Sequence, residues 1–247
     1  MKKFFNFHTA PFLTMALGAA GLVAQRYVQQ SGIDARGLYI SNHPAVILSF
    51  LLIPATLGIL LLCTWPLHKK AQTAYTPAPS HLYSLLCLLA FGFLLVHSIH
   101  ALGADLAGWE RICAWCKLLT TLLVGLNLGL SLAGKNISYL LQAALTLVLV
   151  LIMVCNYRQW SSDPQLLAYF FPLMATSFLL LGSYQRTALA AGNGNSSLFC
   201  LFNLGALFFC LMAMPSGGIF FGGMAFWQLA SFWSGKPLTK ENPSEAA

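Results

Sequence analysis

Residues 45–65 read AVILSFLLIPATLGILLLCTW, a stretch without a single acidic or basic side chain. A transmembrane helix needs about 20 consecutive apolar residues, because each residue adds about 1.5 Å and the hydrocarbon core is about 30 Å thick. This stretch is therefore long enough to cross a bilayer as one helix. Whether the rest of the chain repeats the pattern decides the fold.

Seven further stretches have the same character. With the first one, they lie at residues 7–27, 45–65, 82–102, 113–132, 137–157, 165–185, 198–214 and 219–233. We expect each to form a spanning helix, which makes the protein an all-α polytopic membrane bundle of about eight transmembrane helices. The last stretch is short, and a re-entrant or tilted segment is the alternative there. Pro54 and Pro172 fall inside two of the predicted spans, where they are expected to kink the helix.

The composition of the 247-residue chain agrees with a membrane setting. Charged residues make up 8% of the chain and hydrophobic residues 58%, whereas an ordinary soluble domain is about 25% charged. The connections are too short for a folded soluble domain, which takes about 50 residues or more. We therefore expect one membrane domain over residues 1–247, a short polar tail at 234–247 and no soluble catalytic domain.

The number and placement of the charged residues indicate which partners and which cellular location to expect. The formal net charge is +7, but Lys and Arg are scattered between apolar stretches rather than gathered on one face, so we expect no nucleic-acid partner. With the N-terminus inside, 8 of the 13 Lys and Arg fall on the cytoplasmic side, as the positive-inside rule requires. We predict an integral protein of the cell membrane, bacterial in style, with both termini in the cytoplasm.

The predicted spans contain no Asp or Glu, and every charged residue falls at or beyond the edge of a span. Intramembrane carboxylates are common in proton- and cation-coupled transporters, and paired carboxylates in acid–base hydrolysis. Proton- and cation-coupled transporters and acid–base hydrolases are therefore both disfavoured. The polar residues expected inside the membrane include Thr120, Thr121, Asn127, Gln142, Asn203 and Gln228. Such side chains bond across helices, or they line a pathway for a neutral ligand.

One group of chemically active residues joins the third and fourth spans. His97 and His100 end the third, and Cys113 and Cys116 open the fourth. Residues three apart share a helix face, and a short connection predicts antiparallel neighbours. The spacing is compatible with a tetrahedral site for a metal such as zinc at these four residues. The plain alternative is that the histidines hydrogen-bond to neighbouring helices and the cysteines only pack.

Cys113 and Cys116 are by themselves compatible with a redox dithiol, since a helix N-terminus and nearby basic residues stabilise a thiolate. In this Cys-x-x-Cys motif the sequence resembles the membrane thiol oxidoreductases that pass electrons to quinone. The resemblance covers only residues 113–116 and implies quinone as the electron acceptor. The second cysteine pair of those proteins has no local counterpart, because Cys155 and Cys210 stand alone.

Three functional hypotheses follow. The first, which the sequence favours, is a permease-like protein or one that handles a neutral small ligand without covalent chemistry. The second is a thiol-redox or metal-site protein that uses the His/Cys group. The third is a structural or accessory subunit. Gly125, Gly129 and Ala133 recur every four residues, a spacing that lets helices approach closely, so another membrane subunit or a second copy is the predicted protein partner within the bilayer.

Overall fold

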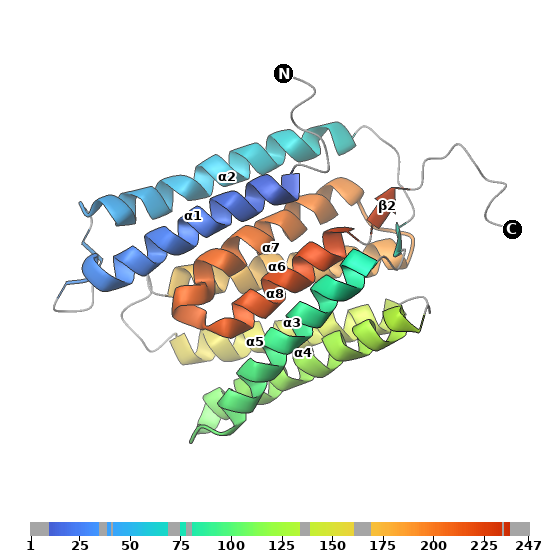
Figure 1. The fold of residues 1–247 in the computed structure, drawn as a ribbon. Helices are drawn as coiled ribbons and strands as arrows, with labels where there is room; N and C mark the ends of the chain where they lie inside the picture. The colour runs from blue at the N-terminus through green and yellow to red at the C-terminus, as the bar shows by residue number, and fades with distance from the viewer. Residues whose placement is uncertain are drawn as a thin grey trace, which may run out of the picture.

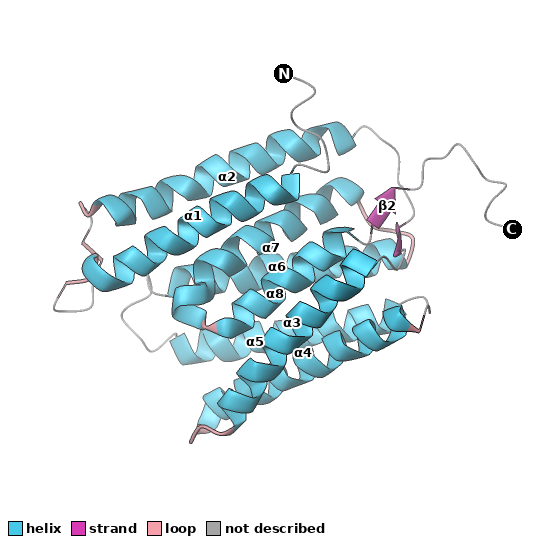
Figure 2. Ribbon diagram, viewed as in Figure 1, coloured by secondary structure: helices cyan, strands magenta, loops and turns pink. Residues whose placement is uncertain are grey.

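The structure is a computed structural model that describes residues 10–34, 39–40, 42–68, 75–77, 81–133, 139–160, 169–233 and 235–237. The described helices are α1 (Ala10–Ser31), α2 (Pro44–His68), α3 (His81–Leu102), α4 (Gly108–Leu132), α5 (Tyr139–Trp160), α6 (Phe170–Ala190), α7 (Ser196–Gly217) and α8 (Ile219–Trp233). The predicted helical bundle is confirmed (Figure 2). Two three-residue strands, β1 (Tyr75–Pro77) and β2 (Gly235–Pro237), pair antiparallel beside it.

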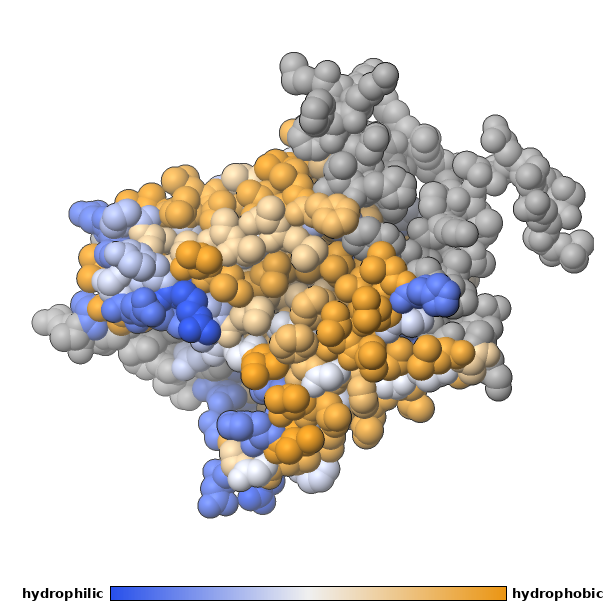
Figure 3. Space-filling model, viewed as in Figure 1, coloured by the Kyte–Doolittle hydropathy of each residue, from blue (hydrophilic) through white to orange (hydrophobic). Residues whose placement is uncertain are grey.

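The helices present an apolar surface. Five of those described, α2, α3, α4, α5 and α7, are long and apolar enough to cross a membrane, and α8 is a shorter apolar helix. Large apolar side chains stand outward, with Leu62 73% and Leu147 66% exposed. Figure 3 shows the apolar colour over the helices and hydrophilic residues toward the ends. The chain is therefore a multi-pass membrane protein, and the count of eight crossings stays a prediction.

Six helices form a ring. Going round it, α3 packs on α4, α4 on α5, α5 on α6, α6 on α7, α7 on α8, and α8 packs back on α3. Helices α1 and α2 pack on each other and on the outside of α7 (Figure 1). As a result α7 is the most enclosed of the five described helices that could cross a membrane: 72% of the residues in its apolar stretch are buried, against 22% for α2.

The two ends of the ring differ. The α3–α4 and α7–α8 connections mark what we call the hairpin end. The opposite end is called the strand end, because β1 precedes α3 there and β2 follows α8; β1 also packs on α6. Figure 1 shows both strands beside the ends of these helices. Buried groups can therefore be placed by their distance from one end or the other.

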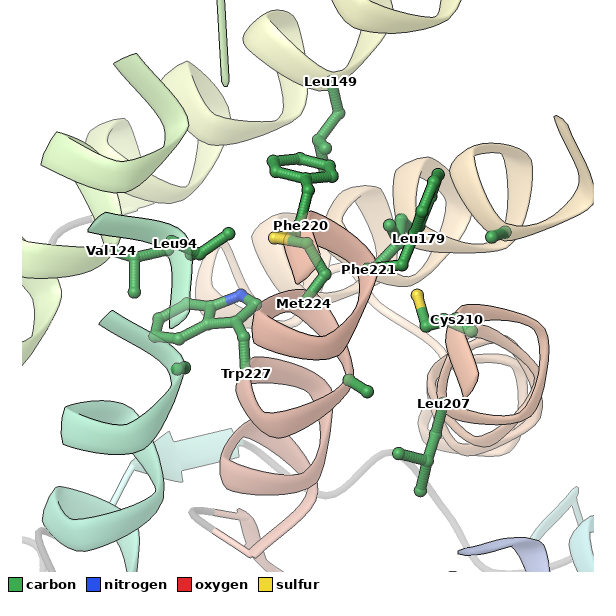
Figure 4. Close-up of a cluster of buried hydrophobic side chains, with 14 of the residues drawn as sticks. Leu94, Val124, Leu149, Leu179, Leu207, Cys210, Phe220, Phe221, Met224 and Trp227 are labelled. Carbon is green, nitrogen blue, oxygen red and sulfur yellow. The ribbon is translucent and has the colours of Figure 1, made fainter. Parts of the chain in front are cut away.

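The shortest helix, α8, closes the ring between α7 and α3. It follows α7 after the single residue Gly218, whose φ of +73° favours glycine. Its side chains Phe220, Phe221 and Met224 are buried, and Figure 4 shows them among Leu94, Val124, Leu149 and Leu179 of the surrounding helices. We call these seven residues the apolar section. It fills the ring from its middle toward the hairpin end.

Candidate functional site

Of the two predicted histidines, His97 lies on the side of α3 that meets α8. The His97 ring lies 5.6 Å from the ring of Phe220, and its Nε2 atom is buried without a hydrogen-bond partner among the described residues. Lys117 Nζ stands 5.3 Å from the centre of the same Phe220 ring. His100 is exposed. His97 therefore lies on the α8 side of the α3–α4 pair.

The predicted cysteines lie toward α5. Cys113 Sγ donates to Asn156 Oδ1 at 3.3 Å, and Cys116 interacts with Cys155, also of α5. In the described chain no three His, Cys, Asp or Glu side chains come close enough to hold a metal ion. The zinc arrangement expected for His97, His100, Cys113 and Cys116 does not form there. His97 lies against Phe220 of α8, whereas Cys113 and Cys116 contact residues of α5.

Burial also disfavours a reactive dithiol at these positions. Cys113, Cys116 and Cys155 are free thiols with only 4%, 9% and 3% of their surface exposed. Apolar surroundings oppose thiolate formation. Since α4 already begins at Gly108, the cysteines lie beyond its first turn, where the effect of the helix dipole has fallen off. The third thiol, Cys155, is one that the sequence did not place here.

The six predicted intramembrane polar residues, Thr120, Thr121, Asn127, Gln142, Asn203 and Gln228, are all buried. The two threonines donate to carbonyl groups one turn back on α4, both at 3.0 Å. Asn127 links α4 to α5: its Nδ2 donates to the Leu123 carbonyl at 2.8 Å, and its Oδ1 accepts from Gln142 Nε2 at 2.7 Å. The threonine bonds therefore lie within α4, and the Asn127–Gln142 bond joins two helices.

Asn203, on α7, is different. It is 1% exposed, and neither Nδ2 nor Oδ1 has a hydrogen-bond partner among the described residues. Gly182 of α6 lies directly against it, since a Cβ built on that glycine would be 3.6 Å from Asn203 Cα. Gln142 Oε1 is likewise buried and without a partner in the described chain. A buried polar group left unsatisfied costs about 1–3 kcal/mol, so each such atom points to a missing contact.

Among the described residues, Arg186 is a buried charged residue that the sequence did not predict. It is 4% exposed on α6, where it donates to Ser231 Oγ of α8 and lies 4.8 Å from the Trp227 ring centre. It also interacts electrostatically with Tyr83 of α3. The sequence placed Arg186 just beyond the predicted 165–185 stretch, whereas α6 runs from Phe170 to Ala190 and includes it in its last turns.

A signal for this shift was present in the sequence. Pro172 falls in the first turn of α6, where its missing N–H is harmless and its fixed φ suits a helix start. It therefore marks the beginning of the helix rather than a kink in mid-span. A start near residue 170 with the same length includes Arg186.

Hydrogen-bonding side chains gather at the strand end of the ring. Each of the six ring helices supplies a buried one within about two turns of its end there. They are Tyr83, Asn127, Gln142, Arg186, Asn203 and Ser231, which we call the polar end group. Thr146 of α5 adds hydrogen bonds of 2.9 Å to Ser183 and 3.3 Å to Thr187 of α6.

The described acidic residues lie at the opposite end. Asp34 follows α1, Asp105 lies between α3 and α4, and Glu110 is in the first turn of α4. The Glu110 carboxylate accepts from Gln159 Nε2 at 2.9 Å. The buried guanidinium and these carboxylates are thus separated by the length of the ring.

Comparisons with protein-family models, curated proteins and solved structures found no match. What the protein does must therefore be inferred from the side chains themselves. Guanidinium, amide and hydroxyl groups bind and orient polar ligands, and none of them is a strong base at neutral pH. The polar end group is thus suited to binding rather than to covalent chemistry.

Proposed function

We propose that the protein is a permease-like membrane protein that handles a small polar ligand within the ring of α3–α8, at the polar end group. The observation that carries the proposal is the Asn203 amide, which is fully buried with both polar atoms unsatisfied among the described residues. A ligand with one donor and one acceptor would satisfy both atoms. Gln142 Oε1, also buried and without a described partner, offers a further acceptor on α5.

The ring is polar at the strand end and apolar from its middle toward the hairpin end, and this division supports a permease-like role. A ligand that enters from the strand end meets amides and hydroxyls first and the apolar section beyond them. Permeases bind substrate between helices and open to each side in turn. In this proposal the apolar section is the closed side. α8, joined to α7 through Gly218 alone, is the element whose movement opens it.

The positive-inside prediction indicates from which side of the membrane the ligand would bind. With the N-terminus in the cytoplasm, the strand end faces the cytoplasm, since α1 begins and α8 ends on that side. The ligand would then bind from the cytoplasmic side of a bacterial inner membrane.

Uptake into proteoliposomes tests the proposal. Purified full-length protein is reconstituted and offered radiolabelled erythritol, a neutral probe, or radiolabelled succinate, an acidic one. We expect uptake of at least one probe above that of protein-free liposomes, and its loss in Asn203→Leu. The unfolding midpoint of this variant should not fall, because Leu removes an unsatisfied amide. Uptake equal to that of empty liposomes for both probes, or uptake unchanged in Asn203→Leu, would refute the proposal.

A thiol-redox protein is the second candidate, and one observation favours it. Cys155 of α5 interacts with Cys116 of α4, so a third thiol adjoins the Cys113–Cys116 pair. In that case two of the three thiols would be oxidised to a disulfide. The two electrons and two protons released would reduce a quinone to a quinol. The burial of all three thiols is the reason for placing it second.

A further inference from the structure

We infer that the hairpin end of the ring holds an anion-binding site, in which Lys117 of α4 and His97 of α3 bind the carboxylate or phosphate group of a ligand beside the ring of Phe220. This site lies at the opposite end of the ring from the polar end group. It does not depend on the permease-like role, so either proposal can fail alone. The inference rests on where the two basic side chains lie and on the hydrogen bonds that they can offer.

The contact between Lys117 and Phe220 places the lysine on the inside of the ring. Lys117 Nζ stands 5.3 Å from the centre of the Phe220 ring, although α4 and α8 make few contacts because α3 stands between them. Phe220 is fully buried and lies next to Leu149 of α5 (Figure 4). One turn before Lys117, Cys113 bonds to Asn156 of α5. The side of α4 that faces into the ring therefore carries the ammonium group.

Lys117 also lies well within a helix that can cross the membrane. α4 begins at Gly108, so Lys117 is about 13 Å along it. Charged side chains at such positions are costly and mark the pathways of substrates or ions. The ammonium group has three N–H donors, and the Phe220 ring faces one side of it. Glu110, the nearest acidic residue along α4, accepts a hydrogen bond from Gln159 instead.

His97 supplies the second contact. Its ring lies 5.6 Å from the Phe220 ring, so both basic side chains meet the same aromatic ring. Its Nε2 atom is buried without a hydrogen-bond partner in the described chain, and a buried polar atom of this kind points to a missing contact. Lys117 and His100 both interact electrostatically with His97. His100 is exposed and lies about one turn nearer to the hairpin end, which is the side from which a ligand would enter.

An acidic group would satisfy both side chains at once. One carboxylate or phosphate oxygen accepts a charge-assisted hydrogen bond from the ammonium group of Lys117. A second oxygen of the same group accepts from His97 when its Nε2 carries the proton. A neutral ligand could bond to His97 but would not balance the positive charge of Lys117. A metal ion does not suit this pair, because a lysine ammonium group has no lone pair to donate.

Thermal unfolding of the full-length protein in neutral detergent tests the inference. The probes are succinate and inorganic phosphate, with ionic strength held constant by potassium chloride. We expect at least one probe to raise the midpoint in a saturable way. Lys117→Gln should need about tenfold higher concentrations, because it loses a charge-assisted hydrogen bond, whereas Lys117→Arg should keep most of the response.

Arg111→Gln is the matched control. Arg111 is a basic residue of the same helix near the same end, but it is exposed and donates to the Leu106 carbonyl at 3.0 Å. This variant should respond like the unmodified protein. If Lys117→Gln does not fold, His97→Leu decides, because it removes only the second hydrogen bond and should still need several-fold more of the probe.

A lipid head group is the other source of the same acidic chemistry. In lipid nanodiscs, a midpoint raised by phosphatidylglycerol over phosphatidylcholine, unchanged in Arg111→Gln but lost in Lys117→Gln, supports the site and identifies its ligand as a lipid. No rise with either probe or with phosphatidylglycerol overturns the inference, as does an equal rise in Lys117→Gln and the unmodified protein. A rise that is lost in Asn203→Leu but kept in Lys117→Gln would place the acidic group at the polar end group and overturns it too.

Discussion

The guanidinium of Arg186 on α6 lies 4.8 Å from the centre of the Trp227 ring on α8. The two helices make few other contacts, since the ring places α7 between them. This pair therefore joins two elements that do not otherwise pack closely. It also fixes the charged group at the boundary between the polar end group and the apolar section.

The Arg186–Trp227 contact should be measurable as a coupling energy. A cation over an indole ring contributes about 0.5–2 kcal/mol. We expect Trp227→Leu and Arg186→Gln each to lower the free energy of unfolding, and the double variant to lose less than their sum by about that amount. Trp227→Phe keeps a ring and should lose less than Trp227→Leu. Strict additivity would mean that the ring contributes through packing alone.

The packing of α8 on α3 should be sensitive to a single methyl group at Gly223. A Cβ there would be 2.7 Å from Leu94 Cγ and 3.2 Å from the Ala90 carbonyl oxygen. Overpacking of this kind costs about 1–3 kcal/mol, so Gly223→Ala should lower the unfolding midpoint. Gly129→Ala is the control, because a Cβ at Gly129 meets nothing within 4 Å and alanine is the better helix former. Equal midpoints for both variants would show that α3 and α8 readily move apart.

The amide pair between α4 and α5 makes a third prediction. Gln142→Leu removes the donor to Asn127 Oδ1 and should cost about 1–3 kcal/mol, because the acceptor stays buried and unsatisfied. The double variant Asn127→Leu with Gln142→Leu removes both partners and should recover part of that loss. Chemical unfolding in mixed micelles measures both. A double variant less stable than either single one would point to a wider polar network.

The helices could be predicted from the sequence where the apolar runs are unbroken. α3 begins one residue before the predicted 82–102 and ends at its last residue, and α8 matches 219–233. α6 runs over Phe170–Ala190 instead of the predicted 165–185, because its sequence is more polar and Pro172 starts the helix rather than kinking it. β1 and β2 could not be expected, since three-residue strands that end in proline carry almost no pattern.

The candidate site was harder to predict than the fold. The three-residue spacing predicts a shared face for His97 with His100 and for Cys113 with Cys116, but the rotation of α3 and α4 about their axes is set by tertiary contacts. One of these is the 2.9 Å hydrogen bond between Ser98 and Thr121. Spacing along one helix does not specify that rotation. The polar end group could not be predicted for the same reason, because its residues come from six helices whose rotations are set by tertiary contacts.

The His/Cys residues give the last prediction, which separates a structural role from the metal and redox alternatives. Because Cys113, Cys116 and Cys155 are buried and free, we expect slow maleimide labelling in intact membranes, the same under oxidising and reducing conditions, and rapid labelling after denaturation in SDS. Purified protein should hold far less than one zinc per chain, and His97→Ala or Cys113→Ser should not change this. Labelling of Cys116 that disappears on oxidation and returns on reduction, but persists in Cys155→Ala, would establish an α4–α5 dithiol. Stoichiometric zinc lost in both His97→Ala and Cys113→Ser would mean that α3 and α4 rotate to bring the two pairs together.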